Sequence, residues 1–289
     1  MNTKFEEIKI SQWVQSADND ENKEFRAAVH TILSAISAEK ELKANMVLKG
    51  GILLAIRYQS HRFTKDIDLS TAQTLKDIQP ENIAAALDRG LANMVEILDY
   101  DLDCRVQAHK LQPANQPDAT YPSIKFSIGY AYKGTSKHKR LIKLQSPSII
   151  SIDYSLNEST PNIDSVELTQ GEELLVYSLT DLIAEKFRSL LQQEERNRYR
   201  RQDIFDLCIL LQCIDDVDSV EKKKIRDSVL EKSRARGIDP TADSFESEEL
   251  KRRAKEYYAT IADEIEGDLP DFEESFKYVA NFYKSLPWE

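Results

Sequence analysis

Two aspartates spaced as D-x-D are the residues of this sequence best suited to chemistry. Asp66 and Asp68 lie in the short segment KDIDLS, whose apolar residues suit a β-strand. Since successive side chains of a strand point to opposite faces, the two carboxylates project from the same face. Carboxylates held this close repel each other, and a divalent cation would remove the repulsion. The pair therefore indicates a metal site, although most isolated D-x-D motifs are solvated strand ends.

A glycine pair ahead of the aspartates offers a second chemical function. Gly50 and Gly51 follow the strand-like segment Met46–Leu48 and open an apolar run, 52–58, with helical spacing. A glycine turn that leads into a helix presents free backbone N–H groups, which suit a phosphate. A lone Gly-Gly is usually only a turn, but here strand, glycine turn, helix and D-x-D strand follow one another. This order favours phosphoryl or nucleotidyl transfer.

Hydrophobic periodicity predicts the elements that position these motifs. Apolar spacing predicts helices around 25–36 and 80–98, and strict alternation over 124–132 predicts a half-buried antiparallel strand. We expect further strands at 98–106, at 141–144 as the partner of 124–132, and at 148–155, which carries Asp153. Beyond residue 178 the pattern is helical, and one apolar face over 250–265 predicts a single amphipathic helix.

The predicted helix 179–193 carries a lysine on its apolar face. Ser178 fits an N-cap for this helix, and Lys186 shares a face with Ile183 and Leu190. An ammonium group there is costly unless it snorkels or meets an anion. Two interpretations stay open on these residues alone: a snorkelling or internally paired lysine, and a compact cation that binds a triphosphate.

Composition describes a globular protein of one large or two modest domains, with 289 residues, 41% hydrophobic and 31% charged. No apolar run approaches a membrane span, and the N-terminus lacks the layout of a signal peptide, so we expect a cytoplasmic protein without membrane contact. The formal charge of -11 opposes broad, non-specific binding to DNA. The cysteines show no C-x-x-C spacing, which favours reduced core thiols.

The motifs together resemble those of the AbiEii/AbiGii toxin family, nucleotidyltransferase-like proteins of the DNA polymerase β superfamily. The first family pattern, roughly LKGG[TS]xL…R.[ST].D[IL]DL, is matched by Leu48, Lys49, Gly50, Gly51, Leu54, Arg62, Thr64, Asp66, Asp68 and Leu69. Ile52 departs from it, standing where the family usually has a hydroxyl residue. A second pattern, approximately AEK…R.[KR]D..DL, is matched by Ala184, Glu185, Lys186, Arg201, Asp203, Asp206 and Leu207, with Gln202 at an often basic position.

The resemblance implies a fold and a set of site residues. The fold would be α+β, with a polymerase β-type mixed sheet and flanking helices in a nucleotidyltransferase core domain, 1–174, and a helical C-terminal domain, 175–289. Asp66, Asp68 and Asp153 would bind Mg²⁺, as a two-metal site in which Mn²⁺ could substitute. Lys186 and Asp203 would complete the catalytic set. Nucleotide binding would involve Lys49, Gly50, Gly51, Arg62, Thr64, Lys186 and Arg201, while Asp206 would brace the structure.

The implied function is a toxin that transfers NMP from an NTP to an acceptor hydroxyl in a bacterial toxin–antitoxin or phage-defence system. An antitoxin encoded nearby would be its partner. We favour RNA as acceptor, a tRNA 3′ end in particular, with the arginines around Arg198 on backbone phosphates. Two alternatives remain open: a small-molecule, antibiotic-type nucleotidyltransferase, and a non-catalytic nucleotide-binding partner protein, which Ile52 keeps in view. The retention of mutually repelling carboxylates and of Lys186 speaks against the second.

Overall fold

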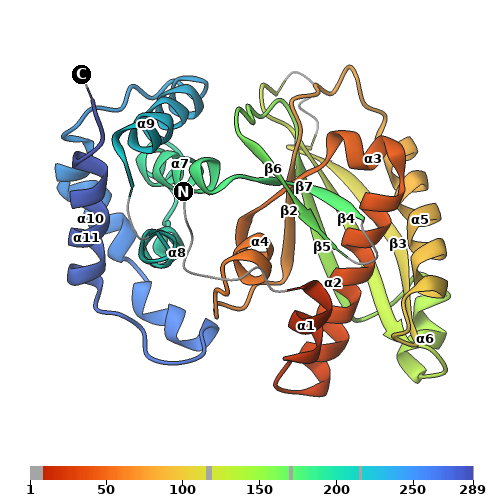
Figure 1. The fold of residues 1–289 in the computed structure, drawn as a ribbon. Helices are drawn as coiled ribbons and strands as arrows, with labels where there is room; N and C mark the ends of the chain where they lie inside the picture. The colour runs from red at the N-terminus through yellow and green to blue at the C-terminus, as the bar shows by residue number, and fades with distance from the viewer. Residues whose placement is uncertain (1–8, 115–118, 169–171, 215–216, 289) are drawn as a thin grey trace. The chain divides into compact units, whose positions relative to one another are not determined.

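The computed structural model describes residues 9–114, 119–168, 172–214 and 217–288, and it divides the chain into two compact units (Figure 1). We call Ile8–Arg57 with Lys65–Val176 the sheet unit. The helical unit contains Tyr177–Glu289 together with the short segment Tyr58–Thr64. In the described parts of the chain, no helix has both the length and the apolar character needed to cross a membrane.

The sheet unit is built on a mixed seven-stranded sheet with the strand order β3-β4-β5-β2-β1-β7-β6. β1 is antiparallel to β2 and parallel to β7, β2 is parallel to β5, and β4 is antiparallel to both β3 and β5. This mixed sheet with flanking helices confirms the α+β prediction. The strands are β1 (Val47–Lys49), β2 (Asp66–Ser70), β3 (Leu102–Gln112), β4 (Ser123–Tyr132), β5 (Ile149–Ser155), β6 (Ile163–Glu167) and β7 (Glu173–Tyr177).

Helices cover one face of this sheet, where Figure 1 shows α2 and α5 lying beside each other. Side chains alternate between the two faces of β4 and β5, and Phe126 and Ile152 are fully buried in the core. The residues directly before and after each of them are polar and half-buried. Asn19 caps α2 by accepting a hydrogen bond from the Asn22 N–H, 2.8 Å long. The helices are α1 (Ile10–Gln15), α2 (Asp20–Ala38), α3 (Lys40–Asn45), α4 (Gly50–Arg57), α5 (Pro80–Ile97) and α6 (Ser136–Leu141).

In the helical unit, α7 starts as the sequence predicts. The Ser178 hydroxyl accepts a hydrogen bond from the Asp181 N–H, and α7 packs along α9 (Figure 1). Phe187 on α7 contacts the rings of Phe245 and Tyr283, which ties α7 to the C-terminal helices. The elements are α7 (Leu179–Leu191), α8 (Arg201–Gln212), α9 (Ser219–Arg234), η1 (Ser244–Glu246), α10 (Glu248–Lys255), η2 (Tyr258–Glu264) and α11 (Phe272–Lys284).

Three local predictions differ from the structure. A partner strand at 141–144 is wrong, because Thr135 caps α6 in that region and β4 pairs with β3 and β5 instead. The single helix over 250–265 is wrong too. α10 ends at Lys255, and Tyr257 then takes a left-handed φ of 62° before η2 begins. The strand expected at 98–106 runs over Leu102–Gln112. The cysteines are buried free thiols, as predicted.

Candidate active site

The three predicted acidic residues share one face of the sheet. β2 and β5 are parallel neighbours in which Asp68 and Asp153 are direct partners, so their side chains lie next to each other on the same face. Asp66, two residues before Asp68, projects from that face as well and is exposed, whereas Asp68 and Asp153 are half-buried. The face is the one opposite the apolar side chains of Ile67, Leu69 and Ile152.

A lysine stands on either side of the central acid pair. Lys49 of β1 is the direct partner of Asp68, and Lys125 of β4 is the direct partner of Asp153. The sequence Lys–Asp–Asp–Lys therefore runs across four adjacent strands on one face, and we call it the acid row. Lys49 Nζ reaches Ser155 Oγ at 3.4 Å, while Lys125 makes no hydrogen bond or ion pair with any described residue.

Lys125 is a further candidate residue of the active site, and the sequence did not indicate it. It occupies a polar position of the alternating strand that the sequence did predict, and nothing local distinguishes it from the serines two residues away on either side. Only the register between β4 and β5 places it opposite Asp153. The signal that could have found it is the pairing of Ser-x-Lys-x-Ser in β4 with Ser-x-Asp-x-Ser in β5.

Gly50 connects the glycine pair to the acid row. It has φ +73°, and a Cβ placed on it would lie 2.1 Å from Asp68 Oδ2 and 2.9 Å from Asp68 Cβ. α4 can therefore begin against the Asp68 carboxylate only because residue 50 has no side chain. The positive N-terminal end of α4 then lies beside a negative group, which is a favourable arrangement. Ile52 is 1% exposed, so its side chain belongs to the core and this position offers a phosphate only its backbone.

The donor set fits a hard divalent cation that also takes oxygens from water or substrate. Asp153 Oδ1 is buried and has no hydrogen-bond partner in the described residues, which is costly for a carboxylate oxygen unless a cation meets it. In the described ranges, no group of three or more His, Cys, Asp or Glu side chains forms a metal site by itself. Mg²⁺ usually binds through one or two carboxylates, with water and substrate phosphates completing its coordination.

A second charged group is buried in the helical unit. Lys186 Nζ donates to Asp203 Oδ1 at 3.0 Å and to Asp206 Oδ2 at 2.6 Å. Arg62, from the segment Tyr58–Thr64, donates from Nε and Nη2 to the two oxygens of Asp206, both at 3.0 Å. We call these four residues the buried network. It brings together the lysine and both aspartates of the second motif with an arginine of the first.

The charged forms of Lys186, Asp206 and Arg62 stabilise one another. Burial opposes the charged form of Lys186, but Asp206 and Asp203 outweigh burial and raise its pKa. Burial likewise opposes a charged Asp206, yet Lys186 and Arg62 hold the pKa of that carboxyl below its usual value. The pKa of Arg62 is also raised, because Asp206 overcomes the cost of burying the guanidinium. Lys186, Asp206 and Arg62 are therefore ionised at neutral pH.

The predicted nucleotide-binding residues fall into two groups. Lys49, Gly50 and Gly51 belong to the sheet unit, while Arg62, Thr64, Lys186 and Arg201 belong to the helical unit. Arg201 Nη1 donates to Thr260 Oγ1 at 2.6 Å and the guanidinium also pairs with Glu264. Thr64 makes no hydrogen bond with the described residues.

Comparisons with known proteins agree with this chemistry. A family model described as "Nucleotidyl transferase AbiEii toxin, Type IV TA system" matches residues 31–281. A crystal structure of a proposed nucleotidyltransferase from H. pylori is similar at a TM-score of 0.50 and 12% identity, covering 93% of this chain and 95% of that one. The structure of JHP933 from Helicobacter pylori is similar at a TM-score of 0.52 and 12% identity, covering 93% of each chain. At this identity the likeness shows the fold. No curated protein matches the sequence.

Proposed function

We propose that the protein transfers a nucleoside monophosphate from an NTP to an RNA hydroxyl with the help of Mg²⁺. The chain belongs to the AbiEii family of nucleotidyltransferase toxins from type IV toxin–antitoxin systems. Family membership supplies the reaction class, an NTP substrate and an antitoxin partner. The observation that supports the site is the adjacency of Asp68 and Asp153, with Gly50 held against Asp68. We favour a tRNA 3′ end as acceptor and phage defence as the setting.

The sheet unit provides the reactive groups in this proposal. Asp66, Asp68 and Asp153 would hold the metal, which when bound neutralises the triphosphate and lowers the pKa of the attacking hydroxyl. Asp153, whose Oδ1 has no hydrogen-bond partner in the described residues, accepts the proton of that hydroxyl. The backbone N–H groups at the start of α4 bind phosphate oxygens, and Lys49 contributes a positive charge next to Asp68.

The helical unit supplies binding groups that already have partners. Lys186 uses two of its three N–H donors on Asp203 and Asp206, which leaves one for a triphosphate oxygen. Asp203 therefore acts by orienting Lys186. The guanidinium groups of Arg62 and Arg201 already pair with carboxylates, so each would have to bind a nucleotide in addition to its acidic partner. We propose the core domain, 1–174, and the helical domain, 175–289, as the functional division along the chain, with the segment Tyr58–Thr64 contributed to the helical unit. We also propose a cytoplasmic setting.

A transfer assay tests this proposal. Purified protein is incubated with each α-labelled NTP, Mg²⁺ or Mn²⁺, and total bacterial RNA. We expect label on a tRNA-sized band, release of pyrophosphate, and no product from Asp68→Ala. Asp99→Ala is the matched control, because Asp99 is exposed and its loss changes the net charge equally. Label on a small molecule without RNA would contradict the RNA acceptor, and NTP binding without pyrophosphate release would contradict catalysis.

A further inference from the structure

An open pocket of about 520 Å³ lies on the surface of the helical unit. It forms where the segment before α8 meets the turn between α10 and η2. Its lining includes Arg198, Tyr199, Arg200, Tyr257 and Thr260. The pocket therefore combines arginines with two aromatic rings, in a protein whose formal charge is -11.

The two tyrosines of the pocket are exposed in contact with each other. Tyr199 is 42% exposed and Tyr257 is 59% exposed. Their rings meet edge to face, with centroids 5.6 Å apart at an interplanar angle of 89°. Tyr257 holds a left-handed φ of 62°, which is uncommon for a residue with a side chain. Because the two rings are perpendicular, another ring can stack on the face of one tyrosine and then stands edge-on to the other.

Arg198 in the pocket lining, and Arg196 just before the lining residues in the chain, have no acidic partner in the described residues, whereas Arg201 and Arg253 pair with Glu264 and Glu249. The side chains of Arg196 and Arg198 are exposed and make no hydrogen bond or ion pair with the described residues. Burial and then the neighbouring charges of Arg236, Arg188 and Arg198 lower the pKa of Arg196, as expected in a local excess of positive charge. Arg253 lies over the Tyr199 ring, with Cζ 5.7 Å from the centroid. The pocket is thus suited to an anion.

We propose that this pocket binds an unpaired nucleotide of a single-stranded nucleic acid, with its base stacked on Tyr257 and edge-on to Tyr199, and with its phosphates on Arg198 and Arg196. A nucleotide is the common ligand that joins a flat ring to a negative charge, and stacking on aromatic side chains binds single strands without reading sequence. The assignment to RNA rests on the proposed function, in which the acceptor is RNA. The pocket would hold the acceptor strand, and of the residues predicted to bind NTP only Arg201 is among those that line it.

Binding of a fluorescein-labelled, unstructured RNA oligonucleotide, followed by fluorescence anisotropy, tests the pocket without any chemistry. We expect Tyr257→Ala to weaken binding about tenfold. Arg198→Ala should weaken binding and reduce the slope of log K against log salt by about 0.7, the value for one phosphate contact in a single strand. In the transfer assay, Tyr257→Ala should raise the KM for RNA and leave kcat and the KM for NTP unchanged.

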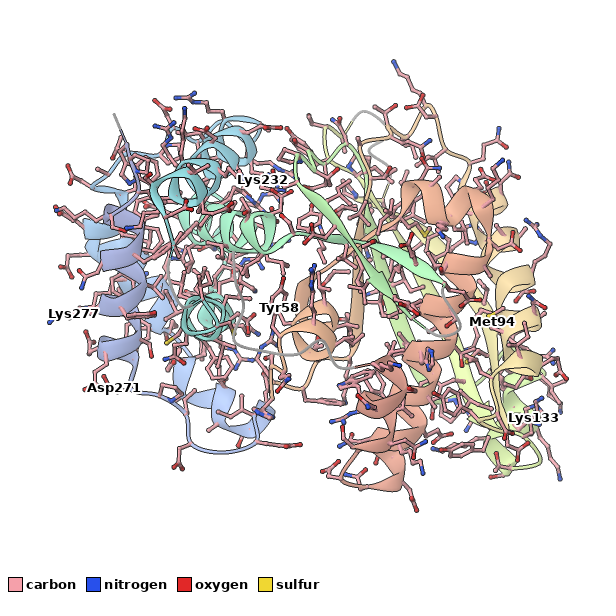
Figure 2. All side chains as sticks on the ribbon, viewed as in Figure 1. Tyr58, Met94, Lys133, Lys232, Asp271 and Lys277 are labelled. Atoms are coloured by element: carbon pink, nitrogen blue, oxygen red, sulfur yellow. The ribbon has the colours of Figure 1, made fainter. Side chains whose placement is uncertain are left out.

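Two control variants match the substitutions in type. Tyr278→Ala removes a tyrosine that is 43% exposed on α11, and Lys277→Ala removes an exposed positive charge from the same helix (Figure 2). Neither residue lines the pocket, so both variants should bind RNA like the wild type. Binding of a DNA oligonucleotide of the same sequence is measured in the same assay. Equal binding of RNA and DNA supports a stacking site that does not read the sugar, whereas binding of DNA alone overturns the assignment to RNA.

The binding and transfer results separate this inference from the proposed function. If RNA accepts label but Tyr257→Ala and Arg198→Ala bind RNA like the wild type, the pocket is not the binding site and the proposed function stands. If the two variants lose RNA binding but no RNA is ever labelled, the pocket binds nucleic acid and the RNA acceptor is wrong. Loss of RNA binding in Tyr278→Ala and Lys277→Ala as well would overturn the pocket as a distinct site.

Discussion

The acid row and the buried network have almost the same composition and opposite arrangements. Each contains two aspartates and two cationic side chains. In the acid row the aspartates are neighbours, the lysines stand outside them, and Asp153 Oδ1 has no hydrogen-bond partner in the described residues. In the buried network Lys186 lies between the two aspartates, and Arg62 pairs with Asp206 through both oxygens.

The difference shows that the order of the charges decides whether a cluster binds a ligand or supports the fold. Neighbouring carboxylates on adjacent strands repel each other, and the buried Asp153 Oδ1 has no hydrogen-bond partner in the described residues, so a cation bound at this pair would be stabilised. In the buried network Lys186 and Arg62 hold both oxygens of Asp206 and one oxygen of Asp203, while Asp203 Oδ2 has no hydrogen-bond partner in the described residues. Removal of Asp206 would leave these buried cations with fewer partners. We therefore assign ligand binding to the acid row and structural support chiefly to the buried network.

Removal of Asp206 should cause the largest loss of stability. Asp206→Ala leaves Arg62 and Lys186 with fewer acidic partners in a buried setting, and breaking such a network costs about 3–5 kcal/mol of the free energy of unfolding. Asp68→Ala is the counterpart in the acid row. It should leave that free energy nearly unchanged or raise it slightly, because it removes repulsion from Asp153. Urea unfolding followed by circular dichroism measures both. Equal losses in the two variants would remove the distinction between the sites.

The pH dependence of this effect follows from the pKa shifts of the network. The pKa of Asp206 lies below its usual 3.8, so its contribution is present above that value and is lost as pH falls through the lower, folded pKa. The pKa of Lys186 lies above its usual 10.5, so its contribution is present below that value and is lost as pH rises through the higher, folded pKa. The stability difference between wild type and Asp206→Ala should therefore be constant from about pH 5 to about pH 9.

The sheet unit should instead lose stability in mild acid, because of His30. Burial lowers the pKa of this residue from 6.5 to about 4, and its Nδ1 is 2.6 Å from the Tyr100 hydroxyl. The neutral ring stabilises the fold above pH 6.5, and this contribution, about 3 kcal/mol, is lost as pH falls from 6.5 towards 4. Hydrogen exchange of sheet amides measures it. His30→Phe should flatten the slope, and the exposed His109→Gln should preserve it.

A methyl group on Gly50 should impair the acid row while sparing the fold. In Gly50→Ala the new Cβ would meet the Asp68 carboxylate at 2.1 Å, so Asp68 must move. We expect about a hundredfold loss of nucleotidyl transfer, equivalent to about 2.7 kcal/mol. Gly134→Ala is the matched control, because Gly134 has φ +79° and no atom within 4 Å of an added Cβ. It carries the same backbone strain without the clash, so an equal loss of transfer would show that strain alone is responsible.

The sequence could predict the parts of the site that depend on local spacing. The D-x-D pair, the glycine turn and the Ser178 cap each depend on residues within a few positions, whereas the mixed sheet is implied by the resemblance to the toxin family. The buried network could not be derived in this way, because Arg62 and Asp206 are 144 positions apart. From its apolar face alone, Lys186 could be internally paired or a phosphate ligand. The structure shows two acidic partners, and its contact with a triphosphate stays a prediction.

The helical tail shows a second limit of sequence reasoning. Apolar spacing over 250–265 continues through Tyr257, so periodicity alone predicts one helix. The chain breaks there because Tyr257 adopts a left-handed conformation, which no pattern of apolar residues encodes. The same break exposes the tyrosine in the RNA pocket proposed above. A feature that contradicts the local pattern thus coincides with a candidate binding site, as expected where function and local preference conflict.

Removal of the Lys125 charge should have the smallest effect, which is a change in the affinity of the acid row for a cation. Its ammonium stands one strand from Asp153 and has no acidic partner in the described residues, so it repels a cation bound at the acid pair. Lys125→Met keeps the alkyl chain and removes the charge. At a separation of several ångströms near the surface, one charge changes the binding energy by about 1 kcal/mol, so the affinity for Mn²⁺ should rise about fivefold.

Titration of the protein with Mn²⁺, without nucleotide, measures this effect by electron paramagnetic resonance of the free ion. Lys110→Met is the matched control, because Lys110 is exposed on β3 in the same cross-strand row, one strand beyond Lys125. Its distance from the aspartates and its solvation should leave Mn²⁺ affinity nearly unchanged. Weaker Mn²⁺ binding in Lys125→Met would mean that the lysine organises the acid pair instead of opposing its ligand, and the acid row would then resemble the buried network.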